Sequence, residues 1–196
     1  MKMKKFKAFA FASLVVLSFN FTINGNENDP CKKAFVKQKK SKENSELFAD
    51  TSFLQTKYCN FYSDMKRSLA ISFVRTDSLN YLEFASVYMG KDGFKRKFVL
   101  GPNVAIGFIF KDGTSQIIRF EGSEQLLTNL SNATTNRIIL SKEMLDKLMS
   151  VPISKFEMQN PFGLLNQSKV IAEILSSKQS ERVIKIAHCF HDRVAE

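Results

Sequence analysis

Histidine, cysteine and tryptophan are scarce in this chain of 196 residues, and their scarcity removes several kinds of catalytic site. There is no tryptophan, and there are only two histidines and three cysteines. The motifs G-x-S-x-G, H-E-x-x-H, G-x-x-x-x-G-K and C-x-x-C are absent as well, which argues against serine hydrolases, zinc proteases, phosphate-binding loops and dithiol redox sites. We therefore predict no catalytic and no cofactor-binding residue.

Carboxylates are the remaining groups that could act together in catalysis. A pair drawn from separate positions, such as Asp77 with Glu83, would suit glycoside hydrolysis. Nothing in the sequence selects this pair over others, so a dispersed carboxylate site stays an alternative.

Long apolar runs are absent except near the N-terminus, where a short one follows a basic segment. The segment MKMKKFK carries four lysines and no acid, and the apolar run AFAFASLVVLSF follows it. A membrane-spanning helix needs about 20 apolar residues, so we interpret residues 1–25 as a secretory signal peptide, with a retained anchor as the alternative. The protein is then periplasmic or secreted, with no stable membrane span after signal removal.

The excess of positive charge is confined to the N-terminal part of the chain. The net charge is +10, but residues 1–25 contribute four lysines without an acid, and residues 31–42, CKKAFVKQKKSK, contribute six more. Residues 43–196 carry 19 basic and 17 acidic groups and are nearly neutral. A nucleic-acid-binding domain carries its basic excess on the face that meets phosphate, so we expect no nucleic-acid partner.

The domain organisation follows from this distribution. We interpret residues 26–45 as a basic, partly disordered arm, with a tether to an anionic surface as the alternative. Proline is rare, with four residues, and no internal repeat is visible, so we expect residues 46–196 to form a single domain with a core rich in phenylalanine. Four basic residues cluster in an expected hairpin loop of this domain: Lys91, Lys95, Arg96 and Lys97.

The middle of the chain alternates apolar and polar residues with the period of two that indicates strands. Residues 68–76, SLAISFVRT, and residues 81–89, YLEFASVYM, predict two half-buried strands joined by a turn. Residues 104–110 and 115–122 flank KDGT, where Asp112-Gly113 supplies the left-handed backbone that a tight hairpin requires. We expect at least four antiparallel strands in this part of the chain.

Helical spacing appears after residue 140. Ser141 is placed to cap a short helix that contains Met144, Leu145 and Leu148, and Pro152 prevents its continuation beyond Ser150. The alternation over residues 153–160 then predicts a strand.

In that strand Phe156 and Met158 are expected to point inward. Residues 168–175 fit an edge strand about as well as a helix, and Ser177 or Ser180 opens a final helix. The sequence thus predicts an α+β fold, in which an antiparallel β-sheet meander is followed by helix–strand(–strand)–helix.

Three stretches carry a resemblance: GFIFKDGT, SKEMLDKLMSVPISKFEM and IAHCF. Together with an N-terminal cysteine in a charged segment, they resemble a group of uncharacterised exported proteins of Bacteroidetes bacteria. A P-I-x-K-hydrophobic strand after a helix, here residues 152–156, and a terminal cysteine before a bulky apolar residue, here Cys189-Phe190, recur in that group. The resemblance spans residues 30–192 and implies an α+β domain of unknown function without assigned catalytic residues; Cys59 departs from its pattern.

The stretch IKIAHCFHD, residues 184–192, contains both histidines. On a helix, Val183, Ile186, Ala187, Phe190 and Val194 form one apolar stripe, and His188, His191 and Asp192 lie on the opposite side. His188 and Asp192 could share a surface ion, but catalytic zinc normally has three protein ligands. We therefore interpret both histidines as solvated side chains and predict no metal site.

The cysteines Cys31, Cys59 and Cys189 are possible disulfide partners in an exported protein. They permit three alternative pairs, each with one thiol left over. A Cys31–Cys59 bridge would close a loop of about 29 residues and stabilise the fold by roughly 3–4 kcal/mol on the chain-entropy model. A nucleophilic cysteine would need a base and an orienting group, and the histidines beside Cys189 project elsewhere.

Two functions remain open. The first, which we favour, is an exported non-enzymatic module that binds an unknown protein or envelope ligand through its sheet or loops, because catalytic motifs are missing and the strands are aromatic-rich. The alternative is a small periplasmic hydrolase with a dispersed carboxylate site. A deep cleft with two buried carboxylates would favour the hydrolase, and a flat exposed aromatic face would favour the binding module.

The signal peptide generates a direct prediction. Ser18 and Gly25 are the small residues at plausible cleavage positions, so the mature chain is expected to begin after one of them. Intact-mass measurement of the exported protein checks this, and a mature chain that retains Met1 would contradict it.

Overall fold

The computed structural model describes residues 31–36, 53–64, 66–77, 79–89, 98, 100–102, 104–120, 125–129, 133–161 and 170–195. Within this part of the chain there are ten strands and two helices, and the α+β class is confirmed. In chain order they are β1 (Phe53–Gln55), β2 (Cys59–Ser63), β3 (Arg67–Thr76), β4 (Leu79–Tyr88), β5 (Ala105–Phe110), β6 (Ser115–Arg119), β7 (Gln125–Asn129), β8 (Ala133–Ile139), α1 (Lys142–Ser150), β9 (Ile153–Gln159), β10 (Val170–Ile174) and α2 (Ser177–Ala195).

Six strands form the larger sheet, in the order β1-β3-β4-β8-β7 with β2 also paired to β3. All of their pairings are antiparallel. Strand β4 pairs with β3 from Arg67 to Thr76, so β1 and β2 must share the other edge of β3. There β1 lies beside residues 74–76 and β2 beside residues 68–71.

The smaller sheet has four antiparallel strands in the order β10-β9-β5-β6. Its β5–β6 hairpin turns where the sequence predicts: Gly113 has a φ of 83°, which residues other than glycine rarely adopt. The carboxylate of Asp112 accepts hydrogen bonds from the backbone N–H and the hydroxyl of Thr114, at 3.0 and 2.6 Å, and closes the turn. The hairpin prediction is confirmed.

Phenylalanine rings join the two sheets into one core. The ring of Phe61 on β2 lies 5.2 Å from Phe108 on β5 and 5.8 Å from Phe156 on β9, and the ring of Phe84 on β4 is stacked 6.5 Å from Phe108. Phe156 and Met158 are both buried, so the inward face predicted for β9 is confirmed. We call the face of the six-stranded sheet that contains Phe84 its inner face, and the opposite face its outer face.

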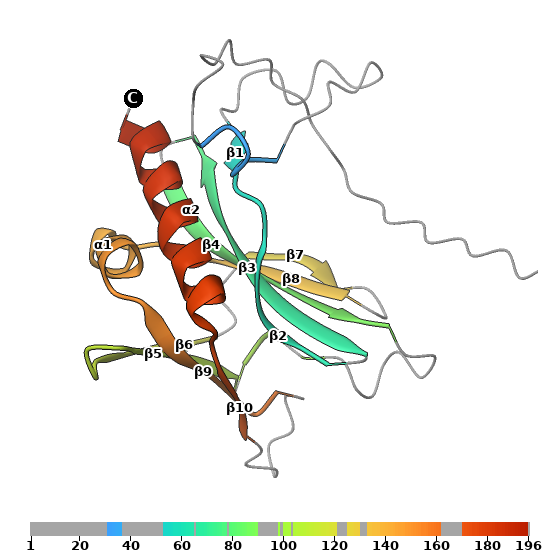
Figure 1. Ribbon diagram of the computed structural model, residues 1–196. Helices are drawn as coiled ribbons and strands as arrows, with labels where there is room; N and C mark the ends of the chain where they lie inside the picture. The colour runs from blue at the N-terminus through green and yellow to red at the C-terminus, as the bar shows by residue number, and fades with distance from the viewer. Residues whose placement is uncertain are drawn as a thin grey trace, which may run out of the picture.

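Helix α2 crosses the inner face of the six-stranded sheet beside the smaller sheet (Figure 1). Its predicted apolar stripe is confirmed, since Val183, Ile186, Ala187 and Phe190 are buried, and the Phe190 ring lies 5.5 Å from Phe73 on β3. The buried hydroxyl of Ser180 donates to the carbonyl of Ile153, which ties α2 to the smaller sheet. Neither described helix combines the length and the apolar character needed to cross a membrane.

Helix α1 has the predicted boundaries and packs beside α2. The Ser141 hydroxyl accepts a 3.2 Å hydrogen bond from the Met144 N–H, which identifies Ser141 as the N-cap. Met144, Leu145 and Leu148 are buried, as the spacing predicts. The chain then turns into β9 through residues 151 and 152.

Residues 31–36 belong to the packed domain, although the sequence places them within an expected arm. Cys31 forms a disulfide with Cys189 on α2, with their Cα atoms 5.4 Å apart, and Figure 1 shows this segment near the C-terminal end of α2. The N–H of Lys57 donates to the carbonyl of buried Ala34, and the N–H of Val36 donates to the carbonyl of Gln55. The boundary expected at residue 46 therefore does not separate these six residues from the core.

Several sequence expectations fall outside the described residues, and some strands were not predicted. Residues 1–25 and the basic cluster at 91 and 95–97 are outside them. Strands β1, β2, β7 and β8 had no sequence assignment, and the edge-strand alternative for residues 168–175 is the one found. The predicted meander is divided, with β3 and β4 in one sheet and β5 and β6 in the other.

Phe190 should contribute strongly to stability because its ring is fully buried. Phe190→Ala is expected to cost about 3 kcal/mol or more through the cavity it leaves. Changing the exposed His188 and His191 together to glutamine is expected to shift stability by less than about 0.5 kcal/mol. Thermal melts with and without zinc test both, and a zinc-dependent stabilisation that the double histidine variant loses would contradict the absence of a metal site.

Candidate functional site

Glu83 is a buried carboxylate on the outer face of the six-stranded sheet. Side chains alternate along β4, and because Leu82 and Phe84 face the core, Glu83 faces the opposite way. It is nevertheless only 2 % exposed. A buried carboxylate is costly unless it is hydrogen-bonded or paired with a cation, so its neighbours define the candidate site.

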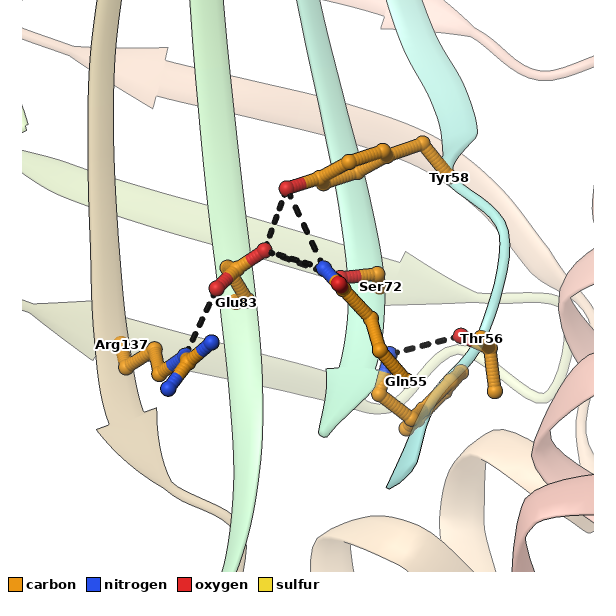
Figure 2. A network of polar contacts seen from close by, with 7 residues as sticks. Gln55, Thr56, Tyr58, Ser72, Glu83 and Arg137 are labelled. Atoms are coloured by element: carbon orange, nitrogen blue, oxygen red, sulfur yellow. Dashed lines mark hydrogen bonds and ion pairs between the residues drawn. The ribbon is translucent and has the colours of Figure 1, made fainter. Parts of the chain in front are cut away.

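Four side chains donate hydrogen bonds to Glu83, as Figure 2 shows. One carboxylate oxygen, Oε1, accepts from the amide of Gln55 at 2.7 Å, from the hydroxyl of Ser72 at 3.3 Å and from the hydroxyl of Tyr58. The other, Oε2, accepts from Nε of Arg137 at 2.6 Å. We call these five residues the Glu83 network; its members come from β1, β3, β4, β8 and the bend between β1 and β2.

The bend between β1 and β2 brings Tyr58 over the sheet. Just after β1, buried Thr56 continues the hydrogen bonding to β3. Its N–H donates to the Phe73 carbonyl, and its side-chain hydroxyl accepts from the Phe73 N–H at 2.8 Å. The chain leaves the strand after Thr56 and re-enters as β2 at Cys59. Tyr58 can therefore reach from the sheet edge to Glu83 on the central strand β4 (Figure 2).

Helix α2 holds this bend from the other side. The Arg182 guanidinium donates to the carbonyl of Tyr58 at 3.2 Å, and the Gln179 amide donates to the carbonyl of Asn60 at 3.3 Å. The position of Tyr58 thus depends on the packing of a helix that lies more than 100 residues away in the chain.

The charges of the network balance each other. Arg137 is 10 % exposed on its side chain and forms an ion pair with Glu83 across the β4–β8 pairing, where the two residues are directly opposite. Burial, followed by the negative charge of Glu83, raises the pKa of Tyr58 above its usual value, so its hydroxyl stays protonated and donates. The ring of Tyr58 still reaches the surface. The arrangement is a neutral, fixed set of polar groups.

Apolar side chains surround the Glu83 network on the outer face. Ile139, 69 % exposed, pairs with half-buried Tyr81 next to the Glu83–Arg137 pair, and exposed Val87 pairs with Ala133 further along. Exposed Leu79 lies on the same face at the start of β4. We define the outer patch as Tyr58, Leu79, Tyr81, Val87, Arg137 and Ile139.

The carboxylate pair considered from sequence does not form. Asp77 lies in the β3–β4 turn with a φ of 51°, whereas Glu83 is paired with Ser72 inside the sheet. Glu83 is four positions after Leu79, the first residue of β4, which corresponds to about 13 Å at 3.3 Å per residue. Asp77 and Glu83 therefore cannot flank the same scissile bond of a substrate, as the two carboxylates of a glycosidase do.

The residues of α2 that the sequence analysis weighed as metal ligands, and interpreted as solvated, lie on the surface of the helix. His188, His191 and Asp192 are exposed, and Nδ1 of His191 lies 3.3 Å from the carboxylate of its neighbour Asp192. Within the described ranges no three histidine, cysteine, aspartate or glutamate side chains are grouped as metal ligands.

The structure selects one of the three possible disulfides. Cys31 pairs with Cys189, so the Cys31–Cys59 bridge considered from sequence is not the one formed, and Cys59 is the thiol left over. Cys59 is buried on the inner face, and burial raises the pKa of its thiol to about 11. A thiol with such a pKa is a poor nucleophile at neutral pH.

A shallow hollow lies elsewhere, between the β5–β6 hairpin and α1. Its volume is about 290 Å³, and it is lined by Phe110, Thr114, Gln116, Glu143 and Lys147 among others. Lys147 is already paired with Asp112 at 2.5 Å, which holds the pKa of that carboxyl at about 2. With its cation engaged, this hollow is a weaker candidate than the Glu83 network.

The sequence analysis named Glu83 as a candidate but did not identify the side chains that donate hydrogen bonds to it. Gln55 and Tyr58 lie in a segment without strand assignment, and Arg137 follows the polar residues of β8, ATTNRII. No apolar–polar alternation marks β8, and the only local signal that would have indicated it is its content of β-branched residues, Thr134, Thr135, Ile138 and Ile139. Its pairing with β4 has no signature in the sequence.

Comparisons with known proteins add no assignment. No protein-family model matches this chain, and searches of curated proteins and of solved structures gave no significant match. The resemblance to exported Bacteroidetes proteins therefore stays a prediction.

The Glu83–Arg137 pair should behave as a buried ion pair. Arg137→Met leaves the Glu83 carboxylate without its cation and is expected to cost about 3–5 kcal/mol. The double variant Glu83→Gln/Arg137→Met is expected to be more stable than Arg137→Met alone, because no uncompensated charge stays buried.

Urea unfolding measures these differences, and Lys155→Met provides the control. The Lys155–Glu157 pair is similar in length, 2.6 Å, but its side chains are 39 % and 28 % exposed, so its loss should cost less than about 1 kcal/mol. If Arg137→Met cost no more than Lys155→Met, the network would not hold a buried charge.

Proposed function

We propose that this protein is an exported, non-enzymatic module that binds a protein partner in the cell envelope or outside the cell through the outer patch. The observation that carries the proposal is the Glu83 network, which holds Tyr58 and Arg137 in place among exposed apolar side chains. Tyrosine and arginine are enriched among the residues that dominate binding energy at protein interfaces.

Preorganisation supports binding at this face. A long side chain that is free in solution loses about 0.5–1.5 kcal/mol of conformational freedom when a partner immobilises it. Arg137 is already ion-paired with Glu83, and the Tyr58 hydroxyl is already bonded to the same carboxylate. A partner that covers these residues therefore incurs little of that loss.

The charge balance indicates what kind of partner surface fits. The negative charge of Glu83 is matched by Arg137, and the flanking positions carry Leu79, Val87 and Ile139. Interface cores are depleted in unpaired charge and enriched in aromatic residues and arginine. We therefore infer a partner surface that is apolar and uncharged where it meets the centre of the patch.

The hydrolase alternative has less support. Both oxygens of Glu83 already accept hydrogen bonds, Asp77 lies away from it, and Cys59 is a weak nucleophile. Two partly exposed tyrosines, Tyr58 and Tyr81, lie on this face of the sheet, which supports the binding module.

A capture experiment with matched variants tests the proposal. Tagged mature protein is incubated with envelope extract of its source cell, and bound proteins are quantified by mass spectrometry. Changing Val87 and Ile139 together to aspartate should reduce capture of a specific partner at least about tenfold, or 1.4 kcal/mol, because charge is placed on the apolar rim.

Ile174→Asp is the control, since Ile174 is 79 % exposed but lies on β10 in the other sheet. It should leave capture unchanged. Equal capture by all variants, or loss only with Ile174→Asp, would overturn the outer patch as the binding face. Hydrolysis of envelope glycans that Glu83→Gln abolishes would instead establish the alternative function.

A further inference from the structure

Strand β10 is an edge of the smaller sheet, and only β9 pairs with it among the described strands. Figure 1 shows it at the margin of the molecule, just before the chain enters α2. Val170 is 53 % exposed, Ile174 is 79 % exposed, and Ala172 between them is exposed as well. An exposed apolar edge offers its free backbone groups to a further strand, which is a common mode of protein association.

The pairing with β9 determines which backbone groups of β10 are free. Leu175 donates its N–H to the carbonyl of Ser154, and this contact continues the β10–β9 register. Hydrogen-bonded pairs recur at every second residue of an antiparallel ladder, so Ile171 and Glu173 are also bonded to β9. The other three residues of β10 direct their N–H and C=O groups away from β9: Val170, Ala172 and Ile174.

The free edge of β10 lacks the features that usually protect an edge strand, which are charged side chains, proline and bulges. The three residues that face it are all apolar, and the pairing with β9 contains no register shift. Strand β6, at the opposite edge of the same sheet, ends in exposed Arg119 and borders the hollow beside α1. The smaller sheet therefore has one protected edge and one that is apolar and regular.

The sequence of β10, VIAEI, is complementary to a second copy of itself. In an antiparallel pair centred on Ala172, Val170 of one copy lies opposite Ile174 of the other, and Ala172 lies opposite its own counterpart. Each such pair of outward-facing residues can exchange two backbone hydrogen bonds. This register pairs all five residues of the strand and places the apolar side chains of both copies on the same face. The resulting two-fold arrangement is closed, as in most protein dimers.

The charges of β10 are compatible with this register. Glu173 lies opposite Ile171 of the other copy, so no two carboxylates are directly opposite, where like charges would be destabilising. The two Glu173 side chains are diagonal to each other, at about 7–8 Å. Their repulsion weakens the pair without preventing it, and its removal should strengthen association.

We propose that β10 is a self-association surface, through which two copies of this chain pair about a two-fold axis at Ala172 and join their four-stranded sheets into one. A single five-residue strand makes a small contact compared with the roughly 1,600 Å² that stable interfaces bury. The dimer is therefore expected to be weak and to depend on concentration. It leaves the outer patch of each copy free and does not rest on the function proposed for that patch.

Sedimentation equilibrium of the protein from about 1 μM to 1 mM measures the association. Ile174→Asp should raise the dimer Kd at least about tenfold, and Glu173→Gln should lower it. Ile117→Asp is the control, because Ile117 is 51 % exposed but lies on β6 at the other edge of the sheet. It should leave the Kd unchanged. Ile174→Asp keeps the outer patch, so dimerisation and partner capture are measured separately.

Cysteine cross-linking tests the register. Residues opposite each other in a hydrogen-bonded pair have Cα atoms about 5.5 Å apart, within the range of about 4.4–6.8 Å that a disulfide requires. Ala172→Cys should therefore form a covalent dimer under mild oxidation. In Val170→Cys the two new thiols are four positions apart along the strands, about 13 Å, and should not cross-link. The native cysteines do not interfere, since Cys31 and Cys189 are bonded and Cys59 is buried.

Three results would overturn the proposal. The first is a protein that stays monomeric over the whole concentration range. The second is a dimer that Ile174→Asp does not weaken, which would place the interface elsewhere. The third is equal cross-linking of Ala172→Cys and Val170→Cys, which would indicate random collision in place of a fixed register.

Discussion

The contact between the two sheets, made by phenylalanine rings, is the interaction on which the rest of the structure depends. Phe61 and Phe84 from the larger sheet meet Phe108 and Phe156 from the smaller one, and all four are buried. Exposure of these rings to water would cost about 1.5–3 kcal/mol of transfer free energy for each ring, so the two sheets pack together. Helix α2 covers another part of the same face, where Phe190 meets Phe73. The outer face is thereby left without a helical layer among the described elements.

Strand β4 carries a different chemistry on each side as a result. On its inner side, Leu82 and Phe84 are in the core, followed by Ser86 and Tyr88 where the apolar layer becomes polar. On its outer side, Glu83 accepts hydrogen bonds from four side chains on four other segments: Gln55, Tyr58, Ser72 and Arg137. The network stabilises the broken edge of the sheet, since Gln55 ends β1 and Tyr58 lies in the β1–β2 bend, and it orients the groups that we propose for binding. The structural role and the proposed binding role therefore fall on the same side chains.

The disulfide explains why the N-terminal segment belongs to the domain. Residues 31–36 are too few to form an element with its own core, yet Ala34 is buried and Phe35 bridges to Thr56. The Cys31–Cys189 bond joins them to α2 across a sequence separation of 158. A cross-link over so long a separation constrains the unfolded chain strongly. The segment also borders β1, so it supports the bend that positions Tyr58.

Local patterns in the sequence determined the α+β class, the β3–β4 and β5–β6 hairpins, the two helices and the buried stripe of α2, because periodicity, caps and turn residues act over a few positions. The tertiary structure alone decided that the strands divide into two sheets, that β8 pairs with β4, and that Cys31 rather than Cys59 bonds to Cys189. It also decided the candidate site, since Tyr58, Glu83 and Arg137 are spread over 80 positions. Such contacts depend on which apolar faces meet in the core, and no local pattern in the sequence specifies that choice.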